Sequence, residues 1–490
     1  MVKTPIQQAV LIATATSVRR GHETPTALLR CGGVTLVKRA LMVLARNGVR
    51  RFVVVIADAE IRRATLADRQ LAALEITWVL NAERPQDEAY SLWRARPHLR
   101  GDFFVVPCDR VFSPAVIKAL IAEPLDAVTL AVGSAPIAAL PAGQQAAVLP
   151  ADGHAVALAV PGSGGGLVRS LPEGSATASA HGVRGDAWST GIFVASRTLF
   201  DALDRIEGAD RTRSLPEALA HLAASGSVRA ADIGDGWWHP ARTSFERKRA
   251  ESMLVRSLRK SVDGVIARHI NRRFSLAATR VLMHFPVRPN HVTAFSLLVS
   301  IAAAITAAMA TVTSPGWLIV GALLWQFASM LDGIDGELAR LKFAESKFGE
   351  WFDTLTDDVG KFMFFAGSGF GVAAVSGQAI WLQVCMLAVA VQFGLSVTLY
   401  RKLLRTGSGS HYALSWDLNP QNKSLAMRLY SRFEFMGRRD YYVFAWLCLA
   451  FVGMLELAIV MMVITTAITF GQELLRPRQV RENFSVQPPM

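Results

Sequence analysis

The chain has 490 residues, of which 51% are hydrophobic, and its 52 Lys and Arg residues outnumber 39 Asp and Glu residues to give a net charge of +13. This length predicts two or three domains, and the hydrophobic share is high for a soluble protein. The four cysteines are scattered without a Cys-x-x-Cys pair, so the sequence suggests neither a disulfide framework nor a zinc site. No cleaved signal peptide is expected, because no long apolar run follows a basic start.

Residues 1–245 have the pattern of a soluble α/β domain. Short apolar runs such as Ala9–Ala13, Phe52–Ala57 and Phe103–Cys108 alternate with stretches of helical periodicity such as Leu36–Asn47. Alternating strands and helices predict a doubly wound, mostly parallel sheet. Ligands of such sheets bind at the carboxyl ends of the strands.

Residues 246–288 are rich in Arg and Lys, which alternate with Leu, Val, Ile and Phe. Membrane-length sequence follows directly, so we predict an amphipathic juxtamembrane segment that faces anionic lipid headgroups. A solvated charged helix is the alternative interpretation. Binding of nucleic acid is not expected, because stacking aromatic residues are not interleaved with the basic ones.

The sequence after Pro289 predicts an all-α transmembrane domain at residues 289–476, followed by a cytoplasmic tail at 477–490. Six helical spans are expected, each satisfying its own backbone hydrogen bonds. Their expected positions are 291–311, 316–340, 350–372, 379–400, 441–455 and 457–475. Three connections, near Thr313, Gly377 and Leu455, contain no Lys or Arg, whereas the opposite connections are basic. The positive-inside rule therefore predicts a protein of the cytoplasmic membrane with both termini in the cytoplasm.

Four aspartates lie within or beside the second and third expected spans. Asp332 and Asp335 are three residues apart and Asp353 and Asp357 four apart, so each pair lies on one helix face. An ionised carboxylate in a membrane is costly unless it is paired, metal-bound or facing water. Two such pairs facing each other would form an all-oxygen site for Mg²⁺ or Mn²⁺. The alternative is a structural ion-pair cluster, but Arg340 alone does not compensate four carboxylates.

The stretch reads Asp332-x2-Asp335-Gly336-x2-Ala339-Arg340-x8-Gly349-x3-Asp353-x3-Asp357. At every fixed position it resembles the signature of the CDP-alcohol phosphotransferase family. The resemblance implies six transmembrane helices and transfer of a phosphoalcohol group from a CDP-alcohol to an acceptor hydroxyl, with release of CMP. It also implies two divalent ions bound by these aspartates, which neutralise the diphosphate. Asp357 is the expected general base and a further expected metal ligand.

Other residues are expected to bind the substrates. Gly336, Ala339 and Gly349 lack bulk and allow close approach of the nucleotide, while Arg340 is expected to contact phosphate. Asn290 and Thr293 belong to a Pro-Asn-x-x-Thr segment that resembles the opening of the first span in this family, although an ordinary helix start explains it equally.

Three basic residues are candidates for binding the acceptor. Arg438 and Arg439 lie in a Gly-Arg-Arg-Asp run that resembles family members with phosphorylated inositol acceptors. A positive-inside cluster explains this run almost as well. Lys361 is a further candidate for phosphate contact.

The front domain contains Thr24-Pro25, Gly48–Ile56, Tyr90-Ser91-Leu92, Pro107-Cys108-Asp109 and Thr190-Gly191-Ile192-Phe193. With these stretches it resembles the sugar-phosphate nucleotidyltransferases, in particular the cytidylyltransferase half of bifunctional inositol-1-phosphate cytidylyltransferase/di-inositol-phosphate synthases. Asp109 matches the first metal-binding aspartate of that family. The glycine-rich loop is replaced by Ala13–Ser17, the phosphate-facing lysine by Thr26, and the second acidic positions by Pro240 and Arg242. We therefore expect a degenerate nucleotidyltransferase site, with the domain retained for scaffolding, regulation or handling of the donor.

These patterns predict an integral membrane CDP-alcohol phosphotransferase. The expected donor is CDP-diacylglycerol or CDP-inositol and the acceptor a polyol or polyol phosphate; the family resemblance also suggests a homodimer. An active bifunctional enzyme is the first alternative. A membrane scaffold or sensor with a nucleotide- or partner-binding front domain is the second, and a proton-relay transporter is disfavoured because inverted repeats are missing.

Overall fold

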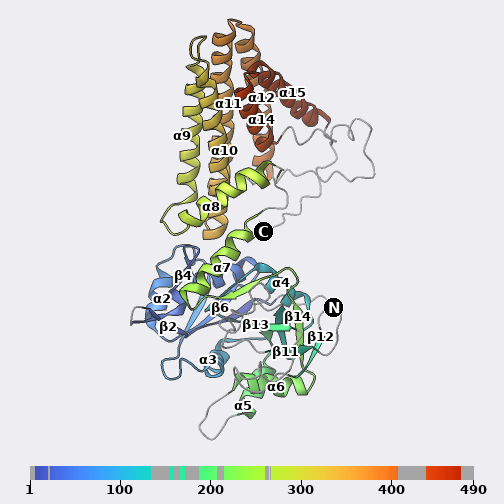
Figure 1. Cartoon of the computed structure of the whole chain (residues 1–490). Helices are drawn as coiled ribbons and strands as arrows, with labels where there is room; N and C mark the ends of the chain where they lie inside the picture. The colour runs from blue at the N-terminus through green and yellow to red at the C-terminus, as the bar shows by residue number, and fades with distance from the viewer. Residues whose placement is uncertain are drawn as a thin grey trace. The chain divides into compact units, whose positions relative to one another are not determined.

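The computed structural model describes residues 6–19, 22–133, 155–158, 166–170, 187–206, 214–259, 264, 266–406 and 438–475. The tail expected at 477–490 lies outside the described residues. The chain forms two compact units, Met1–Leu254 and Val255–Met490. Figure 1 shows an α/β unit in the first and a helical unit in the second.

The front unit is built on one nine-stranded sheet with the order β10-β14-β12-β11-β13-β8-β1-β6-β7. Its strands are β1 (Gln8–Ala13), β6 (Arg51–Ile56), β7 (Glu75–Leu80), β8 (Phe103–Pro107), β10 (Val128–Gly133), β11 (Ala155–Leu158), β12 (Gly166–Ser170), β13 (Ala187–Ala195) and β14 (Val228–Asp232). Strands β8, β1, β6 and β7 are parallel, as are β10 and β14. Strand β13 runs antiparallel to β8, β10 and β11, so the sheet is mixed, and the predicted parallel arrangement holds mainly in its β8–β7 half.

Helices and short strands complete the front unit. The helices are α1 (Leu36–Arg46), α2 (Ala59–Leu66), α3 (Glu88–Ala95), α4 (Pro114–Ala122), α5 (Thr198–Arg205), α6 (Leu215–Ala224) and α7 (Ser244–Ser257), with 3-10 turns at Thr26–Leu28 and Arg96–His98. The short pairs are β2 (Thr16–Arg19) with β3 (His22–Pro25), β4 (Arg30–Cys31) with β5 (Val34–Thr35), and β9 (Arg110–Phe112) with β15 (Trp238–Pro240). Strands β1, β6 and β8 are buried along almost their whole length, which explains their continuous apolar sequence.

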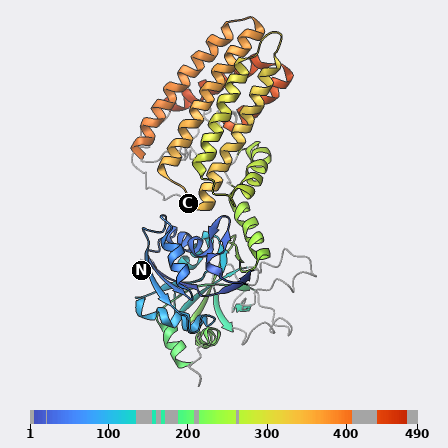
Figure 2. The ribbon, with the colours of Figure 1, turned by 90° about the vertical axis from the view of Figure 1, so that its left-hand side faces the viewer.

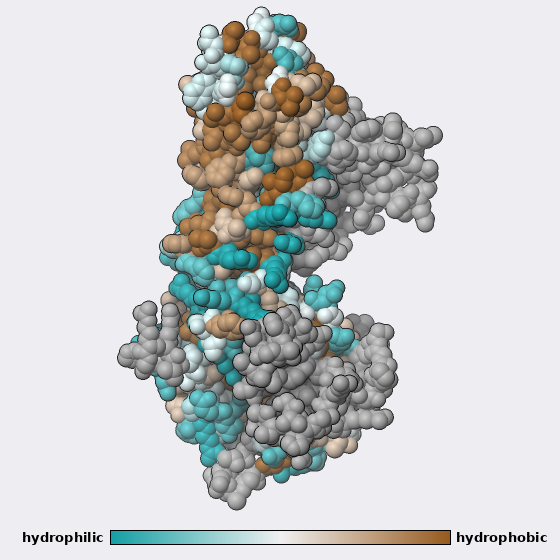
Figure 3. All heavy atoms as spheres, in the orientation of Figure 1, coloured by the Kyte–Doolittle hydropathy of each residue, from teal (hydrophilic) through white to brown (hydrophobic). Residues whose placement is uncertain are grey.

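The helical unit begins with a π-helical turn, η5 (Ala267–Asn271), and α8 (Arg272–Leu282). It continues with α9 (Pro289–Ala308), α10 (Gly316–Lys342), α11 (Lys347–Ser376), α12 (Ile380–Thr406), α14 (Arg439–Val452) and α15 (Leu455–Leu475). Helices α9 to α12 run side by side in both Figure 1 and Figure 2. Hydrophobic residues cover most of their surface in Figure 3.

Four described helices are long and apolar enough to cross a membrane: Pro289–Ala308, Gly316–Lys342, Lys347–Ser376 and Ile380–Leu404. They correspond to the first four expected spans. Helix α14 has 14 residues, and the apolar part of α15 is Leu455–Ala467. At about 1.5 Å per residue, α14 is shorter than the ~30 Å hydrocarbon core. The structure thus supports four spans, and six remains a prediction.

Small residues let the helices of this unit pack closely. A Cβ atom at Gly367 of α11 would lie 2.2 Å from the Ala304 carbonyl oxygen of α9. A Cβ atom at Gly371 of α11 would lie 2.1 Å from the Ala307 carbonyl oxygen of α9. Glycine at these positions therefore lets the two backbones approach. The same unit has an aromatic cluster formed by Trp325 of α10, Phe364 and Phe365 of α11, and Trp446 of α14. Their ring contacts hold α10, α11 and α14 together.

Candidate active site

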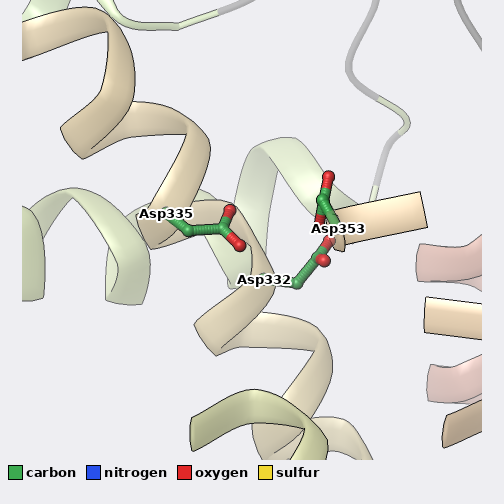
Figure 4. Close-up of side chains that lie close together, drawn as sticks. All are labelled: Asp332, Asp335 and Asp353. Atoms are coloured by element: carbon green, nitrogen blue, oxygen red, sulfur yellow. The ribbon is translucent and has the colours of Figure 1, made fainter. Parts of the chain in front are cut away.

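Three of the four aspartates gather between α10 and α11. Ligand oxygens of Asp332, Asp335 and Asp353 all lie within 4.8 Å of one another. Figure 4 shows the first two on neighbouring turns of α10, with the Asp332 carboxylate turned toward Asp353. An all-oxygen set of carboxylates is the chemistry that Mg²⁺ and Mn²⁺ prefer. The residues present thus fit the divalent ion that the sequence predicts.

The orientation of the Asp335 carboxylate is fixed by two donors. Thr293 Oγ1 of α9 donates to Oδ2 at 2.6 Å, and the backbone N–H of Gly336 donates to Oδ1 at 2.5 Å. Each carboxylate oxygen keeps a second lone pair for a metal. Thr293, predicted to contact the donor, therefore lies directly behind a candidate metal ligand. Such supporting hydrogen bonds position ligands and tune metal affinity.

Arg439, at the start of α14, joins the aspartates of two other helices. Its Nη1 lies 3.0 Å from Asp332 Oδ1 and also donates to Asp357 Oδ2. Asp357 is thus paired with Arg439 and does not belong to the three-carboxylate cluster. The start of α14 is itself held by Asp440, whose Oδ2 accepts the Ala267 N–H at 2.9 Å.

The structure gives local contacts for the remaining predicted residues. A Cβ atom at Gly336 would meet Arg340 Nη1 at 3.3 Å, and one at Gly349 would meet Asn290 Oδ1 at 3.3 Å. These pairs place the two glycines beside predicted substrate contacts. Ala339 lies on α10 between them in sequence, and its carbonyl accepts the Ala344 N–H at 2.8 Å. Arg438 is exposed just before α14.

Lys361 is engaged with a carboxylate outside the cluster. Its Nζ lies 2.7 Å from Asp358 Oδ1, and the Tyr400 hydroxyl donates to Asp358 Oδ2 at 2.7 Å. Asp358 therefore serves a pairing role one residue away from Asp357.

Sequence reasoning missed Glu337, a fully buried carboxylate on α10. Arg272 Nη1 and Ser275 Oγ each lie 2.7 Å from Oε1, and Thr279 Oγ1 donates to Oε2 at 2.7 Å. The three partners recur along one face of α8, which is thereby fixed to the helix that carries Asp332 and Asp335. The sequence did contain a signal for this buried carboxylate. Glu337 is an acidic residue between apolar positions of an expected span, and a neighbouring segment carries a stripe of polar residues.

The front unit places Asp109 directly after β8, at the carboxyl end of a parallel strand. Arg110 Nε donates to Asp109 Oδ1 at 2.8 Å, and Arg242 Nε donates to Oδ2 at 2.6 Å. Burial alone raises the pKa of the Asp109 carboxyl, but the two guanidinium groups outweigh this effect and hold that pKa below its usual value. Both carboxylate oxygens are therefore occupied by protein cations.

Comparison with known proteins agrees with the two-unit organisation. Residues 286–470 match the family model described as CDP-alcohol phosphatidyltransferase, and residues 9–225 match that of the MobA-like NTP transferase domain. The chain is 27% identical over 391 residues to a protein of Thermococcus kodakarensis named bifunctional IPC transferase and DIPP synthase, covering 78% of this chain and 79% of the relative. It is 29% identical over 358 residues to a protein of the same name from Rubrobacter xylanophilus, covering 72% and 75%.

Among solved structures, the inositol-1-phosphate CTP transferase from T. maritima is similar to 51% of this chain and 96% of its own, with 20% identity and a TM-score of 0.42. Each family model covers most of one structural unit. The chain is a transferase in which residues 9–225 match a MobA-like NTP transferase domain and residues 286–470 match a CDP-alcohol phosphatidyltransferase domain.

Proposed function

We propose that the protein is a metal-dependent membrane CDP-alcohol phosphotransferase. It transfers a phosphoalcohol group from CDP-diacylglycerol or CDP-inositol to a hydroxyl of a polyol or polyol phosphate and releases CMP. The observation that carries the proposal is the cluster of Asp332, Asp335 and Asp353 within 4.8 Å, inside two helices of membrane-spanning length. One buried and two partly exposed carboxylates this close together, in helices of membrane-spanning length, need compensating positive charge.

The chemistry divides between the cluster and its neighbours. Two Mg²⁺ or Mn²⁺ ions held by the three carboxylates, with Asp357 as a further ligand, would neutralise the diphosphate of the donor. The acceptor oxygen forms a new bond to phosphorus, the bond from that phosphorus to the bridging oxygen breaks, and CMP leaves with this oxygen. Asp357 takes the proton of the acceptor hydroxyl, which general base catalysis requires.

Arg439 is proposed to hold both the base and the acceptor. Its guanidinium already contacts Asp357, so an acceptor phosphate bound by Arg439 would bring its hydroxyl group close to the base. Arg438 and Lys361 are the further proposed contacts of the acceptor. On the donor side, Gly336, Ala339, Arg340, Gly349, Asn290 and Thr293 are proposed to receive the CDP moiety.

The proposed setting is the cytoplasmic membrane, with six spans, cytoplasmic termini and a homodimer. Helix α8 supports a contact with anionic lipid. It buries Ser275, Leu276 and Thr279, whereas its other face exposes a mixture of apolar and basic side chains. The exposed residues on and just after α8 include Arg273, Phe274, Arg280, Val281 and Phe285. This combination is typical of helices that lie at a membrane surface.

The test is product analysis with the purified full chain in detergent. CDP-inositol and CDP-diacylglycerol are each incubated with inositol, inositol phosphate or glycerol phosphate in the presence of Mg²⁺. The proposal predicts CMP and a phosphodiester from at least one pair, in equal amounts, and no product from the Asp353→Asn variant. Absence of CMP with every pair would favour the scaffold or sensor.

A further inference from the structure

The Asp109 site of the front domain is already filled by two arginines. The Asp109 side chain is 4% exposed. Arg242 contacts Oδ2 through Nε at 2.6 Å and through Nη2 at 2.5 Å, while Arg110 Nε contacts Oδ1 at 2.8 Å. A divalent cation at Asp109 would have to displace one of these guanidinium groups and approach the other at close range, where like charges repel.

The backbone positions Arg242 at Asp109. Strands β9 and β15 pair antiparallel with Pro240 opposite Arg110, and the Ala241 N–H donates to the Asp109 carbonyl at 2.8 Å. The Arg242 N–H donates to Glu246 Oε2 at 2.8 Å, and the Arg242 carbonyl accepts Arg247 Nη1 at 3.0 Å. The position of Arg242 is therefore set by the sheet and by the first turn of α7.

Arg110 occupies space that a glycine leaves for it. Its Nη1 donates to the Thr190 carbonyl at 2.5 Å, and a Cβ atom at Gly191 would lie 2.0 Å from that Nη1. Gly191 also has a φ of +70°, which disfavours other residues. The conformation of β13 thus fits this buried arginine side chain.

The loop after β1 leads directly into a hairpin. The chain passes from Ala13 into the β2–β3 hairpin, where Thr16 pairs with Pro25. The Thr26 N–H donates to the Ala15 carbonyl at 2.9 Å, which closes this turn.

Among the described residues, the one group of three or more potential metal ligands is Asp332, Asp335 and Asp353.

A divalent metal, which the nucleotidyltransferase resemblance implies at Asp109, therefore does not fit the residues present. We propose that the front domain contains an inactive nucleotidyltransferase site that binds no divalent metal. In this site Arg242 supplies the positive charge at Asp109. The chain then does not make its own donor. This inference rests on the proposed function, in which the chain consumes a CDP-alcohol. A separate CTP-dependent cytidylyl transfer must then supply that CDP-alcohol. In that reaction the phosphate oxygen of an alcohol phosphate attacks the α-phosphorus of CTP, and pyrophosphate leaves.

The first test counts Mn²⁺ bound to the full chain in detergent by equilibrium dialysis with electron paramagnetic resonance. Asp109→Asn is expected to bind as many ions as the unchanged chain, whereas Asp353→Asn is expected to lose at least one. The proposal would be overturned if Asp109→Asn bound fewer Mn²⁺ ions than the unchanged chain. Circular dichroism confirms that each variant is folded.

The second test separates the two half-reactions and does not depend on a folded variant. The unchanged chain receives CTP, Mg²⁺ and inositol phosphate, and pyrophosphate is measured; a parallel sample receives preformed CDP-alcohol and acceptor, and CMP is measured. The proposal predicts no pyrophosphate above the rate of a protein-free sample. Pyrophosphate release above that rate would overturn it. Failure of CMP release would instead contradict the proposed function of the membrane domain.

Discussion

Arg439 of α14 lies 3.0 Å from Asp332 of α10 and also donates to Asp357 of α11. One guanidinium group thus joins the proposed metal-binding carboxylates to the proposed base. The contact spans 82 residues of sequence between Arg439 and Asp357. It makes the start of α14 part of the site.

Replacing Arg439 is expected to change metal binding and turnover in opposite directions. Because a cation next to Asp332 opposes binding of a divalent ion, Arg439→Gln is expected to tighten Mn²⁺ binding by roughly tenfold, about 1.4 kcal/mol. Turnover is expected to fall, since the acceptor and Asp357 lose their shared contact. Metal titration and CMP release are measured on the same preparation. Lys347→Gln, at an exposed cation at the start of α11, serves as the control, and equal effects of the two changes would contradict this role.

Asp357 is expected to act in proton transfer. Asp357→Asn should lower kcat by about 10²–10⁴-fold, the usual contribution of a general base, while the protein remains folded. Pre-steady-state CMP formation at saturating donor and acceptor measures this step. Asp358→Asn is the matched control, because Asp358 pairs with Lys361 and Tyr400. A kcat of Asp357→Asn equal to that of the unchanged chain would remove the residue from the mechanism.

Glu337 is expected to stabilise the helical unit. Glu337→Ala leaves the Arg272 charge and two hydroxyl groups without their buried partner, and loss of one member of a buried ion pair costs about 3–5 kcal/mol. Glu345→Ala, at an exposed acid in the connection between α10 and α11, should change stability by less than about 1 kcal/mol, as loss of an exposed polar interaction does. Thermal unfolding in detergent, followed by tryptophan fluorescence, compares the two variants. An unchanged melting temperature in Glu337→Ala would show that α8 is not held by this network.

The low pKa of Asp109 predicts the pH dependence of the front domain. A carboxyl whose pKa is lower in the folded state contributes stability above its unfolded value of about 3.9, and this contribution is lost as the pH falls through the folded value. The unchanged chain should therefore lose stability more steeply below about pH 4 than Asp109→Asn does. Acid titrations followed by circular dichroism give both slopes. Parallel curves would exclude a stabilising Asp109 carboxylate.

The sequence predicted those parts of the fold that depend on local pattern. The continuous apolar runs of β1, β6 and β8 are typical of strands buried on both faces, and they form the parallel half of the sheet. The four long spans followed from hydrophobic length alone. The spacing of Asp332 and Asp335 placed both carboxylates on one helix face, where the structure has them.

Long-range pairings were beyond local pattern. Nothing in the spacing indicated that Arg439 would reach Asp357, or that Glu337 would bind three side chains of α8. The antiparallel strands around β13 also escaped prediction, because their pairing depends on contacts distant in sequence. Arg242 was recognised as a departure from the acidic pattern, but its contact with Asp109 required the β9–β15 register.

The most direct test of the central claim is CMP release from a preformed CDP-alcohol by the purified full chain as a function of divalent metal. We expect chelation to abolish release, Mg²⁺ or Mn²⁺ to restore it, and Asp353→Asn to remain inactive at every metal concentration. CMP release that continues after chelation and in Asp353→Asn would contradict the assignment of Asp332, Asp335 and Asp353 as the catalytic metal site.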